Sequence, residues 1–229
     1  MKNLVFQVNV PPNEQKVSGK KKFQYSSDLY DFSNQRAKKY ASKFGADYFC
    51  LKDSDWLGNE YAPCYQKLYL YNIYKDYDKI LYVDSDAIIT KLCPDIFQFN
   101  KLSAVLDNTP NTEAGQKKLQ RKNTIHNLPN FHNYFCSAVI LFDQRFFGLT
   151  KDYWREELSI WKNVRNGQHD QSIFNVLASK YYGEIKVLDH DWGAHWKKGK
   201  YIVHYGGPSY KLEWKKTIKK FKKFEGELV

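Results

Sequence analysis

Cysteine is scarce in this sequence, and the few thiols present are far apart. The four cysteines are Cys50, Cys64, Cys93 and Cys136. No two of them form a Cys-x-x-Cys pair, so the spacing that is typical of zinc ligands and of redox-active dithiols is missing. A disulfide framework is typical of small secreted chains that are richer in cysteine. We therefore expect reduced thiols and no structural zinc.

Long apolar runs are also missing. No stretch approaches the roughly 20 apolar residues that a transmembrane helix requires, and the apolar segment after Met1 is too short for a signal peptide. We therefore expect a cytoplasmic protein, with peripheral contact to a membrane as an alternative. No internal repeat and no linker divides the sequence, which predicts a single domain over residues 1–229.

Acidic residues are outnumbered: 25 Asp and Glu stand against 36 Lys and Arg, and the formal net charge is +11. This excess is compatible with phosphorylated small substrates, anionic membranes, nucleic acid or simple composition bias. Seven lysines lie within residues 211–223. Because Trp214, Ile218 and Phe221 have helical spacing, residues 211–229 predict a basic C-terminal helix, which either contacts a membrane or packs on the domain.

The sequence has the composition of a protein with a large hydrophobic core, since 42% of its residues are hydrophobic and 17% are aromatic. Short apolar segments predict strands, and segments with helical spacing lie between them. This alternation predicts one α/β domain with a mixed sheet. Strands are expected over residues 4–10, 48–51, 80–83, 102–107, 137–142, 185–188 and 201–203, and helices from an N-cap at Ser33 to Gly45, from Pro63, over 153–161 and over 170–182.

The apolar run at residues 80–83 leads directly into Asp84, Ser85 and Asp86. In open α/β sheets, ligands bind beyond the carboxyl ends of the strands. In an extended chain, alternation would place the carboxylates of Asp84 and Asp86 on the same side. Two hard oxygen ligands suit Mg²⁺ or Mn²⁺ shared with substrate phosphates. The same tripeptide also occurs in turns and at solvated strand ends.

A second informative segment begins at the predicted strand 201–203. His204 follows this strand, a Gly-Gly pair that includes Gly207 comes next, and Lys211 lies a few residues beyond. An imidazole is an acceptable third ligand for Mn²⁺, glycines let the backbone approach a ligand, and a lysine is a point charge for phosphate. The alternatives are a histidine bonded to backbone, a simple turn and a surface lysine.

Taken together, these two segments resemble a nucleotide-sugar glycosyltransferase of the A-type fold. The similarity is strongest to the retaining family that includes glycogenin and the bacterial lipopolysaccharide galactosyltransferases, and it extends in order over about residues 1–211. It implies a single-domain A-type fold, in which helices flank a mixed, mostly parallel central sheet. It also implies that Asp84, Asp86 and His204 hold Mn²⁺ or Mg²⁺.

The resemblance assigns further residues to the site. It implies that Asp107, Asp170 and Gln171 are catalytic residues beside the donor sugar. The donor nucleotide and its phosphates would be bound by Val8, Asn9, Lys67, Asp84, Gly207 and Lys211. Residues 135–139 are similar to a Phe-Asn-Ser-Gly-Val motif of the family, with Cys136 in the place of Asn and Ala138 in the place of Gly.

The activity that the resemblance implies is the transfer of a hexose from a UDP-sugar to a hydroxyl group of a glycan, glycoprotein or glycolipid, with retention of anomeric configuration. In a front-face route, the leaving diphosphate would accept the proton of the acceptor hydroxyl. Alternatively, Asp170 would act as a nucleophile or stabilise an oxocarbenium-like centre. The sequence does not choose between these routes.

Other functions explain parts of the sequence. A haloacid-dehalogenase-like phosphatase also uses Asp-x-Asp at a strand end, although normally on its first strand. A sugar nucleotidyltransferase would need a Gly-rich basic loop where this chain has Pro11 and Pro12. A non-enzymatic basic nucleic-acid-binding domain would explain the net charge but not the Asp, His and Gly-Gly cluster, so we expect no nucleic-acid partner. Finally, the two tryptophans of residues 190–196 predict either an acceptor-binding loop or a packed turn.

Overall fold

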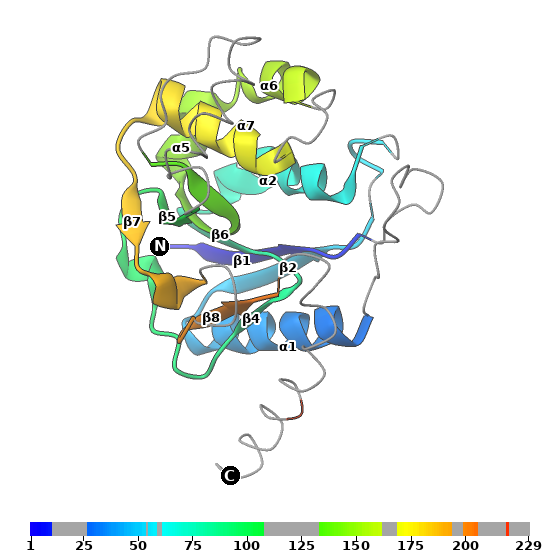
Figure 1. The fold of residues 1–229 in the computed structure, drawn as a ribbon, viewed down its shortest axis with the longest axis vertical. Helices are drawn as coiled ribbons and strands as arrows, with labels where there is room; N and C mark the ends of the chain where they lie inside the picture. Colours follow the sequence, from blue (N-terminus) through cyan, green and yellow to red (C-terminus); the bar gives the residue numbers. More distant parts are fainter. Residues whose placement is uncertain are drawn as a thin grey trace.

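The computed structural model describes residues 1–10, 27–53, 55–58, 61–107, 133–161, 169–193, 199–205 and 219. Its centre is a six-stranded sheet with the strand order β2-β1-β3-β6-β5-β7 (Figure 1). Strand β6 is antiparallel to both of its neighbours, and the other three pairs are parallel. The strands are β1 Asn3–Val8, β2 Asp47–Leu51, β3 Lys79–Val83, β5 Ser103–Leu106, β6 Phe135–Asp143 and β7 Lys186–Leu188. This is the mixed, mostly parallel sheet that was expected.

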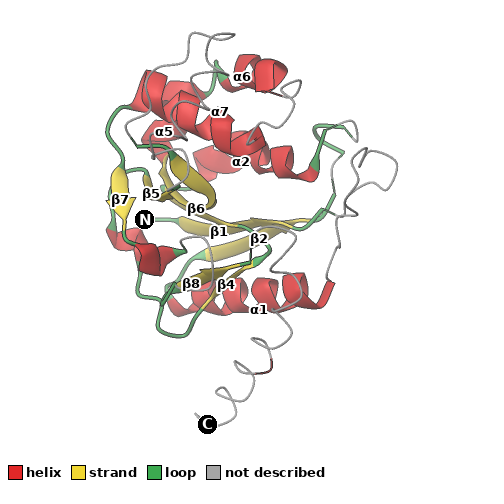
Figure 2. Ribbon diagram, viewed as in Figure 1, coloured by secondary structure: helices red, strands yellow, loops and turns green. Residues whose placement is uncertain are grey.

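Helices cover both faces of this sheet (Figure 2). One face carries α1 (Ser27–Lys43) together with a small antiparallel pair of strands, β4 (Ala87–Ile89) and β8 (Ile202–His204). A 3₁₀ helix over Pro63–Tyr69 continues into α2, and a π-helical turn over Ala178–Tyr182 follows α7. The helices on the second face are α2 Leu70–Ile73, α5 Gln144–Thr150, α6 Trp154–Trp161 and α7 His169–Leu177.

The sheet separates two apolar layers because successive side chains of a strand point to opposite faces. On β1, Leu4 and Phe6 pack in the layer that contains Phe174 of α7, whereas Val5 packs in the layer that contains Ala37 of α1. All five of these side chains are fully buried. The apolar runs in the sequence are therefore continuous because these strands are covered on both faces.

The structure corrects the predicted start of the first helix. Helix α1 begins at Ser27, so Ser33 is an interior residue and not an N-cap. The buried hydroxyl of Ser33 donates to the carbonyl oxygen of Ala87 and accepts a hydrogen bond from Gln7 Nε2 at 3.0 Å. A tertiary partner thus satisfies the hydroxyl that sequence reasoning assigned to a helix terminus.

Strand β4 and helix α5 are additions to the predicted elements, and both are short. The predicted C-terminal helix, residues 211–229, lies outside the described residues apart from Lys219, as do residues 108–132. Among the helices that the structure describes, none is both long enough and apolar enough to cross a membrane.

Candidate metal centre and its polar network

Asp84 and Asp86 lie in a tight turn at the carboxyl end of β3. The backbone N–H of Ala87 donates to the carbonyl oxygen of Asp84 at 2.9 Å, and Ser85 Oγ donates to the carbonyl oxygen of Val8 at 2.6 Å. The prediction that both carboxylates lie on the same side is confirmed. The extended chain that was its reason is wrong, because the turn brings them together while Ser85 anchors the turn to β1.

His204 completes the cluster from a distant part of the chain. It is the last residue of β8, and the antiparallel register places it opposite Ala87. Its Nε2 lies 3.3 Å from Asp86 Oδ1 and 3.9 Å from Asp84 Oδ2. One ligand atom from each of the three residues lies within 4.8 Å of the others. Two carboxylates and an imidazole at this separation fit a divalent cation such as Mn²⁺ or Mg²⁺.

The side chains of this cluster shift one another's pKa. Burial disfavours the charged form of His204, but the carboxylate of Asp86 outweighs burial, and the pKa of His204 lies well above its usual value. Burial raises the pKa of Asp84 and Asp86 adds to this rise, although Lys67 acts against it. Metal ligands must be deprotonated, so a bound cation would compete with protons for these three side chains.

Lys67 connects the candidate metal-ligand cluster, which consists of Asp84, Asp86 and His204, to the rest of the site. This lysine comes from the 3₁₀ helix that begins at Pro63, and only 5% of it is exposed. Its Nζ lies 2.9 Å from Asp84 Oδ1 and 2.7 Å from Asp170 Oδ2. Burial disfavours its charge, but Asp170 and Asp84 more than compensate, so the pKa of Lys67 is raised. Lys67 is therefore a charged residue that holds two carboxylates in place.

The expected catalytic residues lie in one hydrogen-bonded network with Ser137 of β6. Ser137 Oγ donates to Asp170 Oδ2 at 2.7 Å, and the Ser137 backbone N–H donates to Gln171 Oε1 at 3.1 Å. Gln171 Nε2 donates in turn to Asp107 Oδ2 at 2.8 Å. Asp107 follows β5, whereas Asp170 and Gln171 lie in the first turn of α7. The structure thus brings Asp107, Asp170 and Gln171, to which the resemblance assigns catalytic roles, into one network.

A side-chain amide fixes α7 against the sheet next to this network. Asn175 Oδ1 accepts from the backbone N–H of Phe135 at 2.8 Å, and Asn175 Nδ2 donates to the carbonyl oxygen of the same residue at 2.9 Å. Asn175 is 2% exposed. Asn175 satisfies both the backbone N–H and the carbonyl group of Phe135. It therefore sets the position of α7 along β6, and with it the positions of Asp170 and Gln171 relative to this strand.

Sequence reasoning did not assign a role to Tyr82 or Ser137. The Tyr82 hydroxyl donates to Asp84 Oδ1, and its ring centroid lies 4.8 Å from Lys67 Nζ. A polar tip on the strand residue two positions before Asp84 was the signal for Tyr82, since residues two apart share a face. For Ser137, the signal was its place at the centre of the motif at residues 135–139.

Of the four remaining residues that were expected to bind the donor, the structure describes two. Val8 and Asn9 lie at the carboxyl end of β1, where the Asn9 N–H donates to the carbonyl oxygen of Leu51 at 2.8 Å. Gly207 and Lys211 lie outside the described residues. In the candidate acceptor loop, Trp192 is 5% exposed and packs against Phe99 and Tyr201, so it belongs to a packed turn. Residues 194–198 of that segment are not described.

Comparisons with known proteins identify the fold. No protein-family model and no curated protein matches this sequence. Among solved structures, the galactosyltransferase LgtC in complex with donor and acceptor sugar analogs is similar over 91% of this chain and 88% of its own, with a TM-score of 0.54 and 14% identity. A glycosyltransferase involved in the glycosylation of the major capsid of PBCV-1 is similar over 91% and 96%, with a TM-score of 0.57 and 9% identity.

Mouse xyloside xylosyltransferase 1 is similar over 92% of this chain and 99% of its own, with a TM-score of 0.50 and 12% identity. At such low identity these likenesses establish architecture. The matches span almost the whole of the chain and of each of these three glycosyltransferases. The chain therefore has the A-type glycosyltransferase fold.

Proposed function

We propose that this protein is a metal-dependent glycosyltransferase that moves a hexose from a UDP-sugar to a hydroxyl acceptor with retention of anomeric configuration. The observation that carries the proposal is the convergence of Asp84, Asp86 and His204 within 4.8 Å at the carboxyl end of a central strand. In this fold the acidic turn lies next to Lys67 and Asp170, so a metal-bound diphosphate and a sugar would have adjacent places.

The reaction breaks the bond between the anomeric carbon and the diphosphate oxygen, and it forms a bond from that carbon to the acceptor oxygen. A divalent cation on Asp84, Asp86 and His204 would neutralise the charge that develops on the leaving diphosphate. Lys67 adds a fixed positive charge beside Asp84. Because both of its carboxylate partners are buried or half-buried, this charge is little screened by water.

The network on α7 would act on the sugar side of the same bond. Asp170 is ion-paired with Lys67 and accepts a hydrogen bond from Ser137, both at Oδ2. These bonds orient the carboxylate and reduce the nucleophilicity of Oδ2. The geometry therefore favours electrostatic stabilisation of a positively charged anomeric centre by Asp170 over covalent attack. The leaving diphosphate would then take the proton of the acceptor hydroxyl in a front-face route.

Turnover of UDP-sugars in Mn²⁺ and in EDTA tests the activity. We expect UDP release that requires Mn²⁺ and increases when a hydroxyl acceptor is added. Undiminished UDP release in EDTA would contradict the metal assignment. Hydrolysis of aryl phosphates without turnover of any UDP-sugar would favour the phosphatase alternative. Binding of duplex DNA that is tighter than binding of UDP and insensitive to Mn²⁺ would favour the nucleic-acid alternative.

The stereochemistry is tested separately by proton NMR of the first product formed, whose anomeric coupling reports its configuration. Retention is expected, because the resemblance of Asp107, Asp170 and Gln171 is to a retaining family. An inverted product would overturn retention and leave the metal site intact. To separate the two retaining routes, Asp170→Asn is informative: residual turnover fits an electrostatic role, whereas a nucleophilic role would abolish it.

A further inference from the structure

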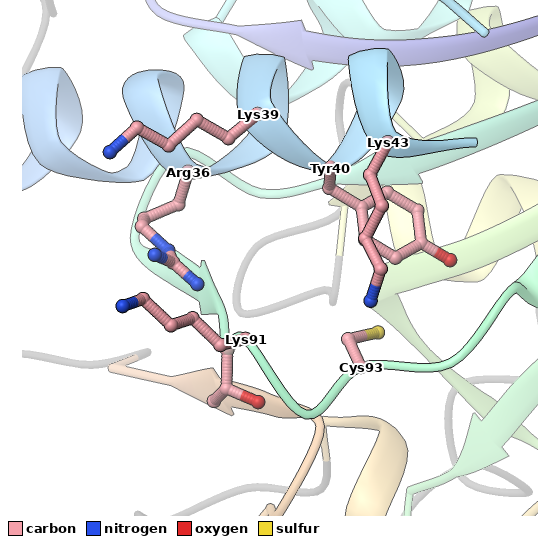
Figure 3. A pocket seen from close by; sticks show the side chains of 7 residues that line it. Arg36, Lys39, Tyr40, Lys43, Lys91 and Cys93 are labelled. Atoms are coloured by element: carbon pink, nitrogen blue, oxygen red, sulfur yellow. The ribbon is translucent and has the colours of Figure 1, made fainter. Parts of the chain in front are cut away.

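A pocket of about 260 Å³ lies between the C-terminal half of α1 and the segment that follows β4. Its lining includes the four basic residues Arg36, Lys39, Lys43 and Lys91. Figure 3 shows Arg36 and Lys39 of α1 near Lys91 at one end, and Lys43 beside Cys93 at the other. None of the described residues that line it is acidic. The pocket is therefore concave, and all the charged side chains that line it are positive.

This pocket is separate from the metal-ligand cluster. Asp86 directly precedes β4 and Thr90 directly follows it, so the two sites lie at opposite ends of this strand. Four residues of extended chain span about 13 Å. A phosphate group at the pocket is thus too far from Asp86 to belong to a diphosphate held by that cluster.

The spacing on α1 places like charges on one face of the helix. Arg36, Lys39 and Lys43 stand at positions i, i+3 and i+7, and Lys39 and Lys43 are an i, i+4 pair. Like charges at this spacing repel each other and destabilise a helix. Among the described residues, neither Lys39 nor Lys91 has an ion-pair partner, and the Lys43 ammonium contacts the ring of Phe44. An anion in the pocket would relieve this repulsion.

The base of the pocket is fixed by hydrogen bonds. Arg36 is 7% exposed, and its Nε donates to the carbonyl oxygen of Ile89 at 2.9 Å. The Tyr40 hydroxyl donates to the carbonyl oxygen of Pro94 at 2.7 Å and accepts from the Ile96 N–H at 2.9 Å. Arg36 is therefore a fixed positive charge at the base of the pocket, held by the adjacent strand.

We propose that this pocket binds a phosphate-bearing ligand, which is either the headgroup of an anionic phospholipid or a soluble phosphate compound. The ammonium groups of Lys39 and Lys91 offer donors to several phosphate oxygens, and the positive charge of Arg36 lies beside them. Neither this site nor its ligand depends on the proposed transfer reaction, because the pocket shares no residue with the metal-ligand cluster.

The test uses the full chain and the variant Lys39→Glu/Lys91→Glu. The matched control is Lys38→Glu/Lys75→Glu, which makes the same charge change at two exposed lysines that do not line the pocket. Residue 38 is next to residue 39 on α1 but points to a different face. A melting temperature for each variant confirms folding, and Lys91→Ala serves as a milder second variant.

Two probes distinguish the sources of phosphate. The first is inorganic pyrophosphate, measured by calorimetry in EDTA. The second is sedimentation with phosphatidylcholine vesicles, either alone or with phosphatidylglycerol. We expect the affinity of at least one probe to fall by about tenfold or more in the pocket variant. The affinity of the same probe for the control variant should be unchanged.

If the pocket variant loses affinity for pyrophosphate, the ligand is a soluble phosphate compound. If it loses affinity only for vesicles that contain phosphatidylglycerol, the ligand is a lipid headgroup. Equal loss in both double variants, or no binding of either probe to the unaltered chain, would overturn the proposal. Because the calorimetry contains neither metal nor UDP-sugar, its failure leaves the proposed transferase activity untouched.

Discussion

The two polar sites at the ends of β4 differ in whether their charged side chains have partners of opposite charge. At the candidate metal centre, Lys67 is 5% exposed and lies between two carboxylates, and His204 is paired with Asp86. In the pocket beside α1, lysines of the same sign are exposed and face open space. Burial explains the difference, since a buried charge without a partner is very costly, whereas water and salt screen exposed charges. The charges of the first site are thus compensated by partners within the fold, whereas those of the second are exposed to solvent.

The largest expected effect is on turnover and concerns the acidic turn. Asp86→Asn removes a charged ligand from the three-residue cluster and should lower Mn²⁺-dependent UDP release by roughly 10³–10⁴-fold, because metal stabilisation of the leaving group contributes several kcal/mol. The circular dichroism spectrum should be unchanged. Asp76→Asn, at an exposed acid outside the site, is the matched control. Similar turnover in the two variants would mean that Asp86 is not a metal ligand.

The second-largest expected effect is on stability and concerns the buried ion pairs of Lys67. Lys67→Met leaves Asp84 and Asp170 without their shared cation and should lower the free energy of unfolding by about 3–5 kcal/mol. Lys101→Met breaks the ion pair of Lys101 with Glu184, whose side chains are 44% and 84% exposed, and should cost less than about 1 kcal/mol. Urea denaturation measures both values. Equal losses would show that burial does not distinguish the two ion pairs.

Metal binding should affect only one of the two sites. At a free Mn²⁺ concentration near 100 times the dissociation constant, the folded protein should gain about 2.7 kcal/mol, which raises the melting temperature by several degrees. The gain should persist in Lys39→Glu/Lys91→Glu and disappear in Asp86→Asn. Thermal scans with Mn²⁺ and with EDTA measure it. A gain that survives in Asp86→Asn would place the cation elsewhere.

The smallest expected effect is that of Ser137→Ala, which removes a hydroxyl that donates to Asp170 Oδ2. Stability should fall by about 1–2 kcal/mol. Turnover should fall by about tenfold with unchanged UDP affinity, because Asp170 is less well oriented. Ser103→Ala also removes a fully buried hydroxyl, but that one donates to Lys101 O. It should lower stability without lowering turnover. If both variants lose turnover equally, the effect of Ser137 is on folding alone.

The elements that were predicted well have strong local patterns. The strand before Asp84 and the long strand through Val139 each contain a continuous apolar run, residues 80–83 and 138–142, and both occur where expected. Short elements were missed: β4 has three residues, too few to establish a period. The start of α1 was placed at Ser33 because a serine there is typical of an N-cap, whereas its hydroxyl is bonded to Ala87 in a neighbouring strand.

The sequence by itself determined which residue types are available for the site and at which strand ends they lie. It placed two carboxylates after one buried strand and an imidazole at the end of another, because apolar periodicity and side-chain chemistry are local properties. Only the tertiary structure decided how these residues are combined. The register of β4 with β8 brings His204 to Asp86, and the packing of α7 against the 3₁₀ helix Pro63–Tyr69 brings Asp170 to Lys67. Such pairings depend on contacts between segments far apart in the chain, and no pattern within a few residues specifies them.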